Sequence, residues 1–246
     1  SDMLAYLAMM APRLVELRRV LKLSGSIYLH CDPTASHYLK LLMDAIFGIV
    51  HFQNEIVWYY KGAGISPKRW GRRHDILLWY SKSAQWFFNP DPVRDEYAET
   101  TKTRFSHYIG NVRGASDYGV QSLNPKGKHP DDVWQVPIVA PSANERLGYP
   151  TQKPEALLER ILNSSSSEGA TVLDAFCGCG TSIAAAQKLG RHWIGIDITH
   201  LAINLIRHRL TDAYGAEAKY RVIGEPTTVP VSYTHLEPTR QAEISY

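Results

Sequence analysis

The sequence is poor in cysteine and contains no long apolar run. Its 246 residues include only three cysteines, an odd number that is too small for a framework of disulfide bonds. This count is typical of a reducing compartment, so we predict a cytoplasmic protein. No apolar stretch approaches the roughly 18 residues that cross a bilayer, and we therefore expect no membrane partner.

The absence of two sequence motifs argues against a dinucleotide-binding site and a metal site. The chain has no GxGxxG motif, which argues against a nicotinamide dehydrogenase. Cys177 and Cys179 form a CxC pair, but no second pair of metal ligands lies near them in the sequence. We therefore expect no metal site there and interpret both cysteines as small side chains in a turn.

The net charge of +3 hides an uneven distribution of basic residues. From Lys61 to Lys128 the chain has twelve Lys and Arg against six Asp and Glu, a local net charge of +6. The remaining residues carry 15 basic and 18 acidic side chains, a net charge of −3. This distribution predicts a polyanionic partner that binds the middle of the chain.

Apolar periodicity divides the chain into two α/β parts that flank an irregular stretch. The pattern predicts helices at 4–21, 35–47, 153–162, 181–189 and 200–214, with strands at 26–31, 55–60, 75–80, 171–174 and 192–197. It also allows a last strand at 219–223, and Pro12 either kinks the first helix or opens its second half. This alternation predicts an α/β fold with a mostly parallel sheet and helices on its faces.

Residues 82–146 lack sustained periodicity and are rich in Asn, Pro, Gly, Arg and aromatic residues. Such a stretch is too long for a structureless loop in a compact domain, so we predict an inserted small subdomain. The expected division is residues 1–81 and 147–223 for the two parts of the main domain, 82–146 for the insert, and 224–246 for an irregular tail.

The segment VLDAFCGCGT, from Val172 to Thr181, carries the strongest local signal. A predicted strand ends in an acid, a glycine turn follows, and a helix begins, which is the corner where α/β proteins cradle nucleotide-like ligands. Gly178 and Gly180 permit close approach of the backbone. Asp197, at the end of the next strand, is placed to accept hydrogen bonds from ribose hydroxyls. A plain strand-turn-helix is the alternative.

The FxGxG pattern looks like the S-adenosylmethionine site of methyltransferases. More specifically, RLGYPTQKPEALLERIL running into VLDAFCGCGTSIAAAQKLGRHWIGIDI is similar to bacterial site-specific DNA amino-methyltransferases, which methylate adenine N6 or cytosine N4. The blocks ELRRVLKLSGSIYLHCD, HYLKLLMDAIFG, FQNEIVW and HDILLWYSK agree in their usual order. The resemblance implies the circularly permuted β group, a Rossmann-like methyltransferase sheet, and a target-recognition region at 82–146.

The resemblance also implies which residues hold the cofactor. The glycine corner supplies one group, and the block that closes over the methionine end of the cofactor supplies a second. The predicted cofactor-binding residues are Asp174, Phe176, Gly178, Gly180, Thr181, Asp197, Thr151, Gln152, Lys153 and Pro154. Asp32 ends a strand inside a matching block and either lines the same crevice or is a solvated turn aspartate.

The basic middle of the chain supplies the predicted DNA-binding residues. Lysines and arginines neutralise phosphates, which is the sequence-independent part of DNA affinity. The predicted set is Lys68, Arg69, Arg72, Arg73, Lys102, Arg104 and Arg113. The alternative for these residues is a solubilising basic face. The aromatic residues that lie between them in the sequence either stack on bases or pack in the core of the insert.

Amino-methyltransferases of this family use a short motif, Asp/Asn/Ser-Pro-Pro-Tyr/Phe, to hold the amino group of a flipped-out base. No such tetrapeptide occurs in this sequence, so no catalytic residue is assigned. In the β order the motif precedes Leu4, and its strand normally lies in the middle of the sheet. We therefore expect a truncated chain that lacks one central strand and is inactive alone; the alternative is that another segment fills the gap.

The sequence thus favours a DNA amino-methyltransferase, adenine N6 over cytosine N4, of a restriction-modification or orphan methylation system. Methyl transfer would be direct, without Cys31 or Cys177 as a nucleophile. The alternatives are a non-catalytic module that binds cofactor and DNA, and a methyltransferase acting on RNA or a small molecule. Double-stranded DNA is the expected partner, with a restriction endonuclease subunit and a homodimer left open.

Overall fold

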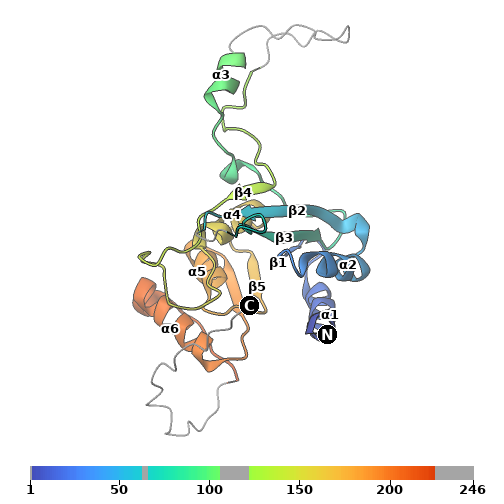
Figure 1. Cartoon of the computed structure of the whole chain (residues 1–246). Helices are drawn as coiled ribbons and strands as arrows, with labels where there is room; N and C mark the ends of the chain where they lie inside the picture. The colour runs from blue at the N-terminus through green and yellow to red at the C-terminus, as the bar shows by residue number, and fades with distance from the viewer. Residues whose placement is uncertain (1, 63–65, 106–121, 225–246) are drawn as a thin grey trace.

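The structure is a computed structural model that describes residues 2–62, 66–105 and 122–224. Two β-sheets with helices on their faces make up the described part of the chain (Figure 1). The first sheet has four strands in the order β1-β3-β2-β4, and the second pairs β5 with β6. Within the described ranges, no helix is both long and apolar enough to cross a bilayer.

The first sheet is built from β1 (Ser26–Cys31), β2 (Phe52–Tyr59), β3 (His74–Ser81) and β4 (Val133–Gln135). Residues Ile76 to Ser81 of β3 are all buried, since β3 has neighbours on both edges and side chains packed on both of its faces. Leu78 and Tyr80 point toward one core, and Leu77 and Trp79 toward another. This alternation is what a strand with two covered faces requires.

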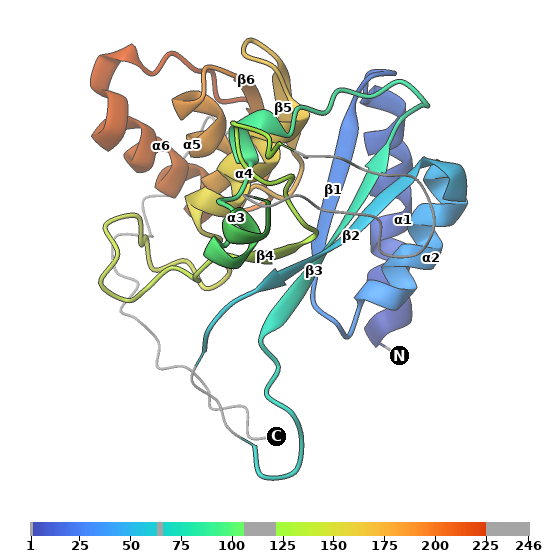
Figure 2. The same cartoon turned by 90° about the horizontal axis from the view of Figure 1, so that it is seen from above.

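Helices α1 (Asp2–Val20) and α2 (Ser36–Phe47) cover one face of the first sheet (Figure 2). Their buried side chains, Met10, Leu14, Leu39 and Met43, share a core with Leu78 and Tyr80. α1 is one continuous helix through Pro12, so the alternative in which Pro12 opens a second helix is not what the structure has.

Helix α4 (Glu155–Ser165) covers the opposite face and joins the two sheets. Leu157 and Ile161 pack with the tryptophans of the first sheet, whereas Leu162 packs with Ala185 and Ala186 of α5 (Thr181–Lys188). The Tyr28 hydroxyl of β1 is also hydrogen-bonded to Ser165 at 2.5 Å. The sequence pattern KPEALLERIL therefore forms the bridge between both halves of the fold.

The second sheet consists of β5 (Thr171–Asp174) and β6 (His192–Gly195), which run parallel. α5 connects them, and α6 (His200–Tyr214) follows β6. Cys177, Ile183, Ile206 and Leu210 form the core between the glycine turn and these helices. Among the described residues, β5 pairs only with β6 and β1 only with β3. The absence of a central strand between β5 and β1 from this chain stays a prediction.

The α/β class is confirmed, but the sheet is mixed. β1–β3 and β2–β3 are antiparallel, whereas the expected parallel pairing holds for β2–β4 and β5–β6. The reason is connectivity: β3 follows β2 directly and turns back beside it, whereas β1 and β2 are joined through α2 and run in the same direction, so β3 is antiparallel to both. Residues 219–223, for which a strand was allowed, form none.

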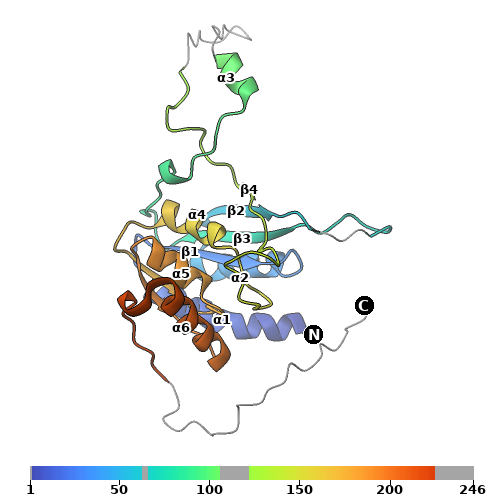
Figure 3. The same ribbon diagram turned by 90° about the vertical axis from the view of Figure 1, so that its left-hand side faces the viewer.

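The 82–146 stretch contains η2 (Asp91–Val93), α3 (Glu99–Phe105) and β4, and α3 projects far from the sheets (Figures 1 and 3). β4 was not predicted, and it returns the chain to the edge of the first sheet beside β2. The two remaining short elements are η1 (Ile49–His51) and η3 (Gly215–Glu217). The boundaries proposed for the insert and for the tail stay predictions.

Candidate functional site

The turn between β5 and α5 contains two glycines in the left-handed region of backbone conformation. Gly178 and Gly180 have φ values of 49° and 76°, in the left-handed region that favours glycine. The Gly180 amide donates to the Cys177 carbonyl at 2.7 Å, and α5 begins at Thr181. The amides in the first turn of α5 have no intrahelical acceptor, so this end of the helix is suited to a carboxylate.

Two acids hold this turn from the ends of the parallel strands. Asp174 of β5 accepts a hydrogen bond from the Phe176 amide at 3.0 Å and one from the Ser182 hydroxyl at 2.5 Å. Asp197, just beyond β6, accepts from the Gly178 amide at 3.0 Å. The structure therefore brings together Asp174, Asp197 and the two glycines, as the sequence predicts.

Asp197 also organises the start of α6. Its second oxygen, Oδ1, accepts hydrogen bonds from the amide and the hydroxyl of Thr199, both at 2.8 Å. The Thr199 hydroxyl in turn accepts from the Ala202 amide at 3.2 Å and caps the helix. Asp197 is half-buried, so its carboxylate is fixed in place and still borders solvent.

Side chains crowd both glycines of the turn. A Cβ atom at Gly178 would lie 3.0 Å from Cε1 of Tyr149, and one at Gly180 would lie 2.6 Å from Cγ1 of Ile206. Phe176 is 48% exposed beside the turn, and Thr181 is buried behind it. The turn thus presents backbone and one aromatic ring to solvent, while its other side is packed.

Arg209 of α6 ties the turn to α4. Its guanidinium lies 3.4 Å from both the Cys179 carbonyl and the Thr181 hydroxyl, and it donates to Glu155 at 2.5 Å. The Arg209 side chain is only 9% exposed. A buried arginine with several acceptors fixes the positions of the groups it contacts, because leaving any of them unpaired is costly.

Cys177 of the turn and Cys31, at the end of β1, are poorly suited to act as nucleophiles. Burial raises the pKa of Cys177 to about 12, and it raises the pKa of Cys31 to the same value. Both thiols therefore stay protonated near neutral pH, and the thiolate is the reactive form.

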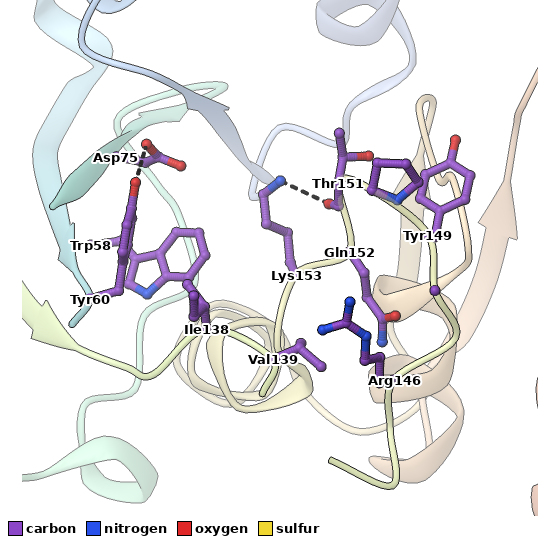
Figure 4. A pocket seen from close by; sticks show the side chains of 12 residues that line it. Trp58, Tyr60, Asp75, Ile138, Val139, Arg146, Tyr149, Thr151, Gln152 and Lys153 are labelled. Carbon is purple, nitrogen blue, oxygen red and sulfur yellow. Dashed lines mark hydrogen bonds between the residues drawn. The ribbon is translucent and has the colours of Figure 1, made fainter. Parts of the chain in front are cut away.

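A cavity of about 310 Å³ lies next to the turn, between the first sheet and residues 146–153 (Figure 4). Trp58, Tyr60 and Asp75 form one wall, and the 146–153 loop forms the other with Arg146, Tyr149 and Lys153. Tyr149 belongs to both places, since its ring also lies against Gly178. The cavity thus adjoins the predicted cofactor corner and combines flat aromatic rings with groups of both charges.

The carboxylate of Asp75 is held at the first-sheet side of this cavity. His30 of β1 and Asp75 of β3 are hydrogen-bonded at 2.9 Å, and the Tyr60 hydroxyl donates to Asp75 at 3.2 Å. Burial alone would raise the pKa of Asp75, but the bonds and charge from His30, Tyr60 and Lys153 outweigh it, so this pKa is lowered. Asp75 is therefore a negatively charged group at the cavity.

Lys153 reaches toward the cavity from the opposite side. Its ammonium donates to the Thr151 carbonyl at 3.0 Å. Burial lowers the pKa of Lys153, while the negative charge of Asp75 opposes that shift. A half-buried ammonium without a close carboxylate among the described residues is suited to an anionic group of a ligand.

Thr151, Gln152 and Lys153 line this cavity, and Pro154 is buried at the start of α4. Gln152 holds the loop closed on itself, accepting from the Leu147 amide at 2.8 Å and donating to the Glu145 carbonyl at 2.5 Å. The loop is therefore a rigid arm beside the glycine turn.

Asp32 lies in the turn that precedes α2. Its carboxylate accepts from the Ala35 amide at 2.9 Å, and its carbonyl accepts from the Ser36 amide at 3.0 Å, where α2 begins. The side chain is exposed and does not line the cavity. A cofactor-binding role for Asp32 stays a prediction.

The predicted DNA-binding residues fall into two groups that are separated in space. Lys68, Arg69, Arg72 and Arg73 lie between β2 and β3, whereas Lys102 and Arg104 lie on α3. Arg113 lies outside the described residues.

Trp58, Tyr60, Asp75, Arg146 and Tyr149 were not predicted as site residues. They come from three separate segments that meet only in the folded chain, so no local motif could reveal the cavity. A partial signal exists at Asp75, an acid that opens an otherwise apolar strand. The run of aromatic residues in EIVWYY is compatible with ordinary core packing.

Comparison with known proteins agrees with this geometry. A family model for DNA methylases, N6_N4_Mtase, matches residues 1–208. The chain is 33% identical over 202 residues to the type II methyltransferase M.HpaI of Haemophilus parainfluenzae, covering 82% of this chain and 58% of that protein. It is 34% identical over 215 residues to the DNA adenine methyltransferase YhdJ of Escherichia coli (strain K12), covering 85% and 69%.

The fold is also similar to that of a solved structure. The M1.HpyAVI–SAM complex superposes with a TM-score of 0.59 at 20% identity and covers 82% of each chain. The present chain spans little more than half the length of M.HpaI. The matching family depends on S-adenosylmethionine as its methyl donor. From the match over residues 1–208, the chain belongs to the N6/N4 DNA methylase family.

Proposed function

We propose that this chain carries the S-adenosylmethionine site and part of the DNA-binding surface of a DNA amino-methyltransferase. The single observation that carries the proposal is the corner at Gly178. There, two left-handed glycines lead into the start of α5, and the Asp197 carboxylate accepts a hydrogen bond from the Gly178 amide. A ligand with a ribose diol and a carboxylate fits such a corner, because amides and an acid face the same space.

Different residues would bind different groups of the cofactor. Asp197 would accept from the ribose hydroxyls, while the amides of Thr181 and Ser182 would donate to the methionine carboxylate. Lys153, half-buried beside the turn, would add positive charge near that carboxylate. When bound, S-adenosylmethionine supplies an electrophilic methyl group on a sulfonium. The task left to the protein is to orient an amino nitrogen toward it.

The cavity beside the turn supports a nucleobase as the acceptor. Trp58 and Tyr60 offer flat apolar surfaces, and Asp75 offers a charged acceptor for an amino group. Adenine N6 is the favoured target, on the overall resemblance of the sequence blocks. The family includes enzymes for both amines, and YhdJ is described as a DNA adenine methyltransferase.

A second reading, a binding module without turnover, is favoured by one specific observation. The 246 residues contain no Pro-Pro pair and therefore no Asp/Asn/Ser-Pro-Pro-aromatic motif. We propose that this chain binds cofactor and DNA but does not transfer methyl groups alone. Incubation of the purified chain with duplex DNA and labelled S-adenosylmethionine should give no labelled DNA, and labelled DNA would contradict this part of the proposal.

Calorimetric titration with S-adenosylmethionine tests the cofactor site. The wild-type chain should bind, and Gly178→Ala should lower the affinity at least tenfold, because the new methyl group strains the turn and meets Tyr149. Gly169→Ala is the matched control: Gly169 also has positive φ, 73°, but nothing lies within 4 Å of the added Cβ. Gly169→Ala should therefore bind as wild type does.

Two outcomes of this titration would contradict the proposal. If titration of the wild-type chain with S-adenosylmethionine gave no heat of binding, the proposed cofactor site would be contradicted. Equal affinities for Gly178→Ala and the wild-type chain would show that the ligand binds elsewhere in the molecule.

A further inference from the structure

Arg209 of α6 links the beginnings of two other helices. α5 lies between α4 and α6 (Figures 1 and 2). The Arg209 guanidinium lies 3.4 Å from the Thr181 hydroxyl and donates to Glu155 at 2.5 Å. Thr181 is the first residue of α5, and Glu155 is the first residue of α4. One side chain therefore connects two segments that are distant in the sequence.

On the side of the glycine turn, Arg209 holds a single peptide group. The Cys179 carbonyl lies 3.4 Å from Nη1 of Arg209, and the amide of the same peptide, that of Gly180, donates to the Cys177 carbonyl at 2.7 Å. Gly180 is the N-cap of α5 and has no side chain to cap the helix. The direction in which the first amides of α5 point therefore depends on this peptide.

On the other side, Arg209 holds the segment that carries Lys153. Glu155 follows Lys153 by two residues, and its own amide donates to the Glu145 carboxylate at 2.9 Å. The Arg209 side chain is 9% exposed and that of Glu155 is 26% exposed. A pair with so little water around it is held in one geometry, because separating the charges would leave the buried arginine without its partner.

Both segments that Arg209 links are proposed to bind the same end of the cofactor. The first amides of α5 and the ammonium of Lys153 would face the methionine carboxylate. Asp197, proposed for the ribose, is bonded to Gly178 and Thr199 instead. A change at Arg209 should therefore affect binding of the amino-acid end of the cofactor more than binding of its adenosine end.

We propose that Arg209 is a positioning residue, which sets the spacing between the start of α5 and Lys153 so that both reach the methionine carboxylate of S-adenosylmethionine. The inference rests on the proposed function for its ligand. It extends that function by assigning preference for the amino-acid end to the Arg209–Glu155 pair, which lies behind the residues proposed to contact the ligand. A purely structural pair would not discriminate between the two ends of the cofactor.

The test compares two ligands by calorimetric titration of the complete chain, at a temperature where thermal unfolding shows each variant to be folded. S-adenosylmethionine has the amino-acid part, and 5′-methylthioadenosine has the adenosine and the sulfur without it. Arg209→Lys keeps the charge but loses the fork that reaches both helices, so it should weaken binding of S-adenosylmethionine about tenfold and of 5′-methylthioadenosine less than about twofold.

Glu155→Gln is the milder variant, because it keeps the shape of the side chain and an acceptor for Arg209. It should weaken binding of S-adenosylmethionine about threefold and leave 5′-methylthioadenosine unchanged. The double variant should bind S-adenosylmethionine about as weakly as Arg209→Lys does, since the two residues act as one unit. Additive losses in the double variant would contradict that unit.

Lys188→Ala is the matched control. Lys188 and Glu159 also link α5 to α4, at 2.7 Å, but Lys188 is exposed and is the last residue of α5. This variant should bind both ligands as wild type does. Equal weakening of both ligands in Arg209→Lys, or weakening of neither, would overturn the positioning role while leaving cofactor binding in place. Failure of the wild-type chain to bind S-adenosylmethionine would overturn the proposed function and this inference together.

Discussion

The two sheets of this protein are built in opposite ways. In the first, β3 lies between β1 and β2, and packed side chains cover both of its faces. In the second, α5 packs on one side, while Leu173, Ile194 and Ile196 on the other side remain exposed among the described residues. The first sheet therefore holds most of the buried apolar surface, which is the main source of stability.

The second sheet concentrates the geometry of the candidate site instead. Its turn contains two glycines with positive φ, and acidic side chains accept hydrogen bonds from backbone amides of the turn. Arg209 contacts the Cys179 carbonyl of the same turn. The difference indicates that the first sheet supplies most of the packed core, while α4 packs against both the first sheet and α5. Substitutions should then separate into large effects on unfolding in the first sheet and smaller or more local ones in the second.

The largest expected difference is between equivalent apolar positions in the two sheets. Leu78→Ala in β3 should lower the free energy of unfolding by about 4 kcal/mol, since Leu78 is fully buried and its loss leaves a cavity. Ile194→Ala in β6, where Ile194 is 52% exposed, should cost less than about 1 kcal/mol. Urea unfolding measures both. Equal losses would contradict the contrast between the sheets.

In the second half of the chain, where we expect smaller effects on unfolding, Arg209 should be an exception. Arg209→Ala should lower the free energy of unfolding by about 3 kcal/mol, because Glu155 and the turn carbonyl lose a buried partner. The exposed Lys188–Glu159 pair provides the control, and Lys188→Ala should change stability by less than about 1 kcal/mol. Thermal unfolding of both variants would reveal whether the buried arginine matters more.

In the first sheet, the buried hydroxyl of Tyr80 donates to Asp44 of α2 at 2.7 Å. Tyr80→Phe keeps the ring in the core but leaves that carboxylate with Lys40 alone. The loss should be about 2 kcal/mol, typical of a hydrogen bond to a charged group. Chemical denaturation tests this value, and a Tyr80→Phe variant as stable as wild type would mean that Lys40 satisfies Asp44 by itself.

The smallest effect is the dependence of stability on acid. Burial would raise the pKa of Asp44, yet its bonds with Lys40 and Tyr80 outweigh burial and lower this pKa. A lowered pKa in the folded state contributes stability above the unfolded value of roughly 3.9, which is lost as the pH falls through the folded pKa. The stability advantage of wild type over Asp44→Asn, about 1 kcal/mol near pH 6, should therefore shrink toward pH 3. A stability difference between wild type and Asp44→Asn that stays constant with pH would contradict this prediction.

The sequence predicts most elements of the fold because their signals are local. Helical spacing and short apolar runs place α2, α6, β1 and β5 within a residue or two of their bounds. Strand direction is not local: IVWYY and ILLWY are both continuous apolar runs, and the sequence of such a run does not indicate whether its partner strand is parallel or antiparallel. β4, with three residues, is too short to leave a pattern.

The same distinction applies to the candidate site. The glycine turn was predictable, since its two acids and two glycines occupy one strand-turn-helix and the strand that follows. The cavity was not, because His30, Asp75 and Lys153 come together only after β1, β3 and the 146–153 loop have packed. The grouping of these three side chains therefore depends on tertiary structure.

Tyr149 separates the glycine turn from the cavity with one side chain. Its ring rests against Gly178, and the same residue forms part of the cavity wall. Any molecule that pushes this ring aside at one place reshapes the other, so the affinities of two ligands bound there are thermodynamically linked. Linkage is reciprocal: whatever factor the first ligand imposes on the second, the second must impose on the first.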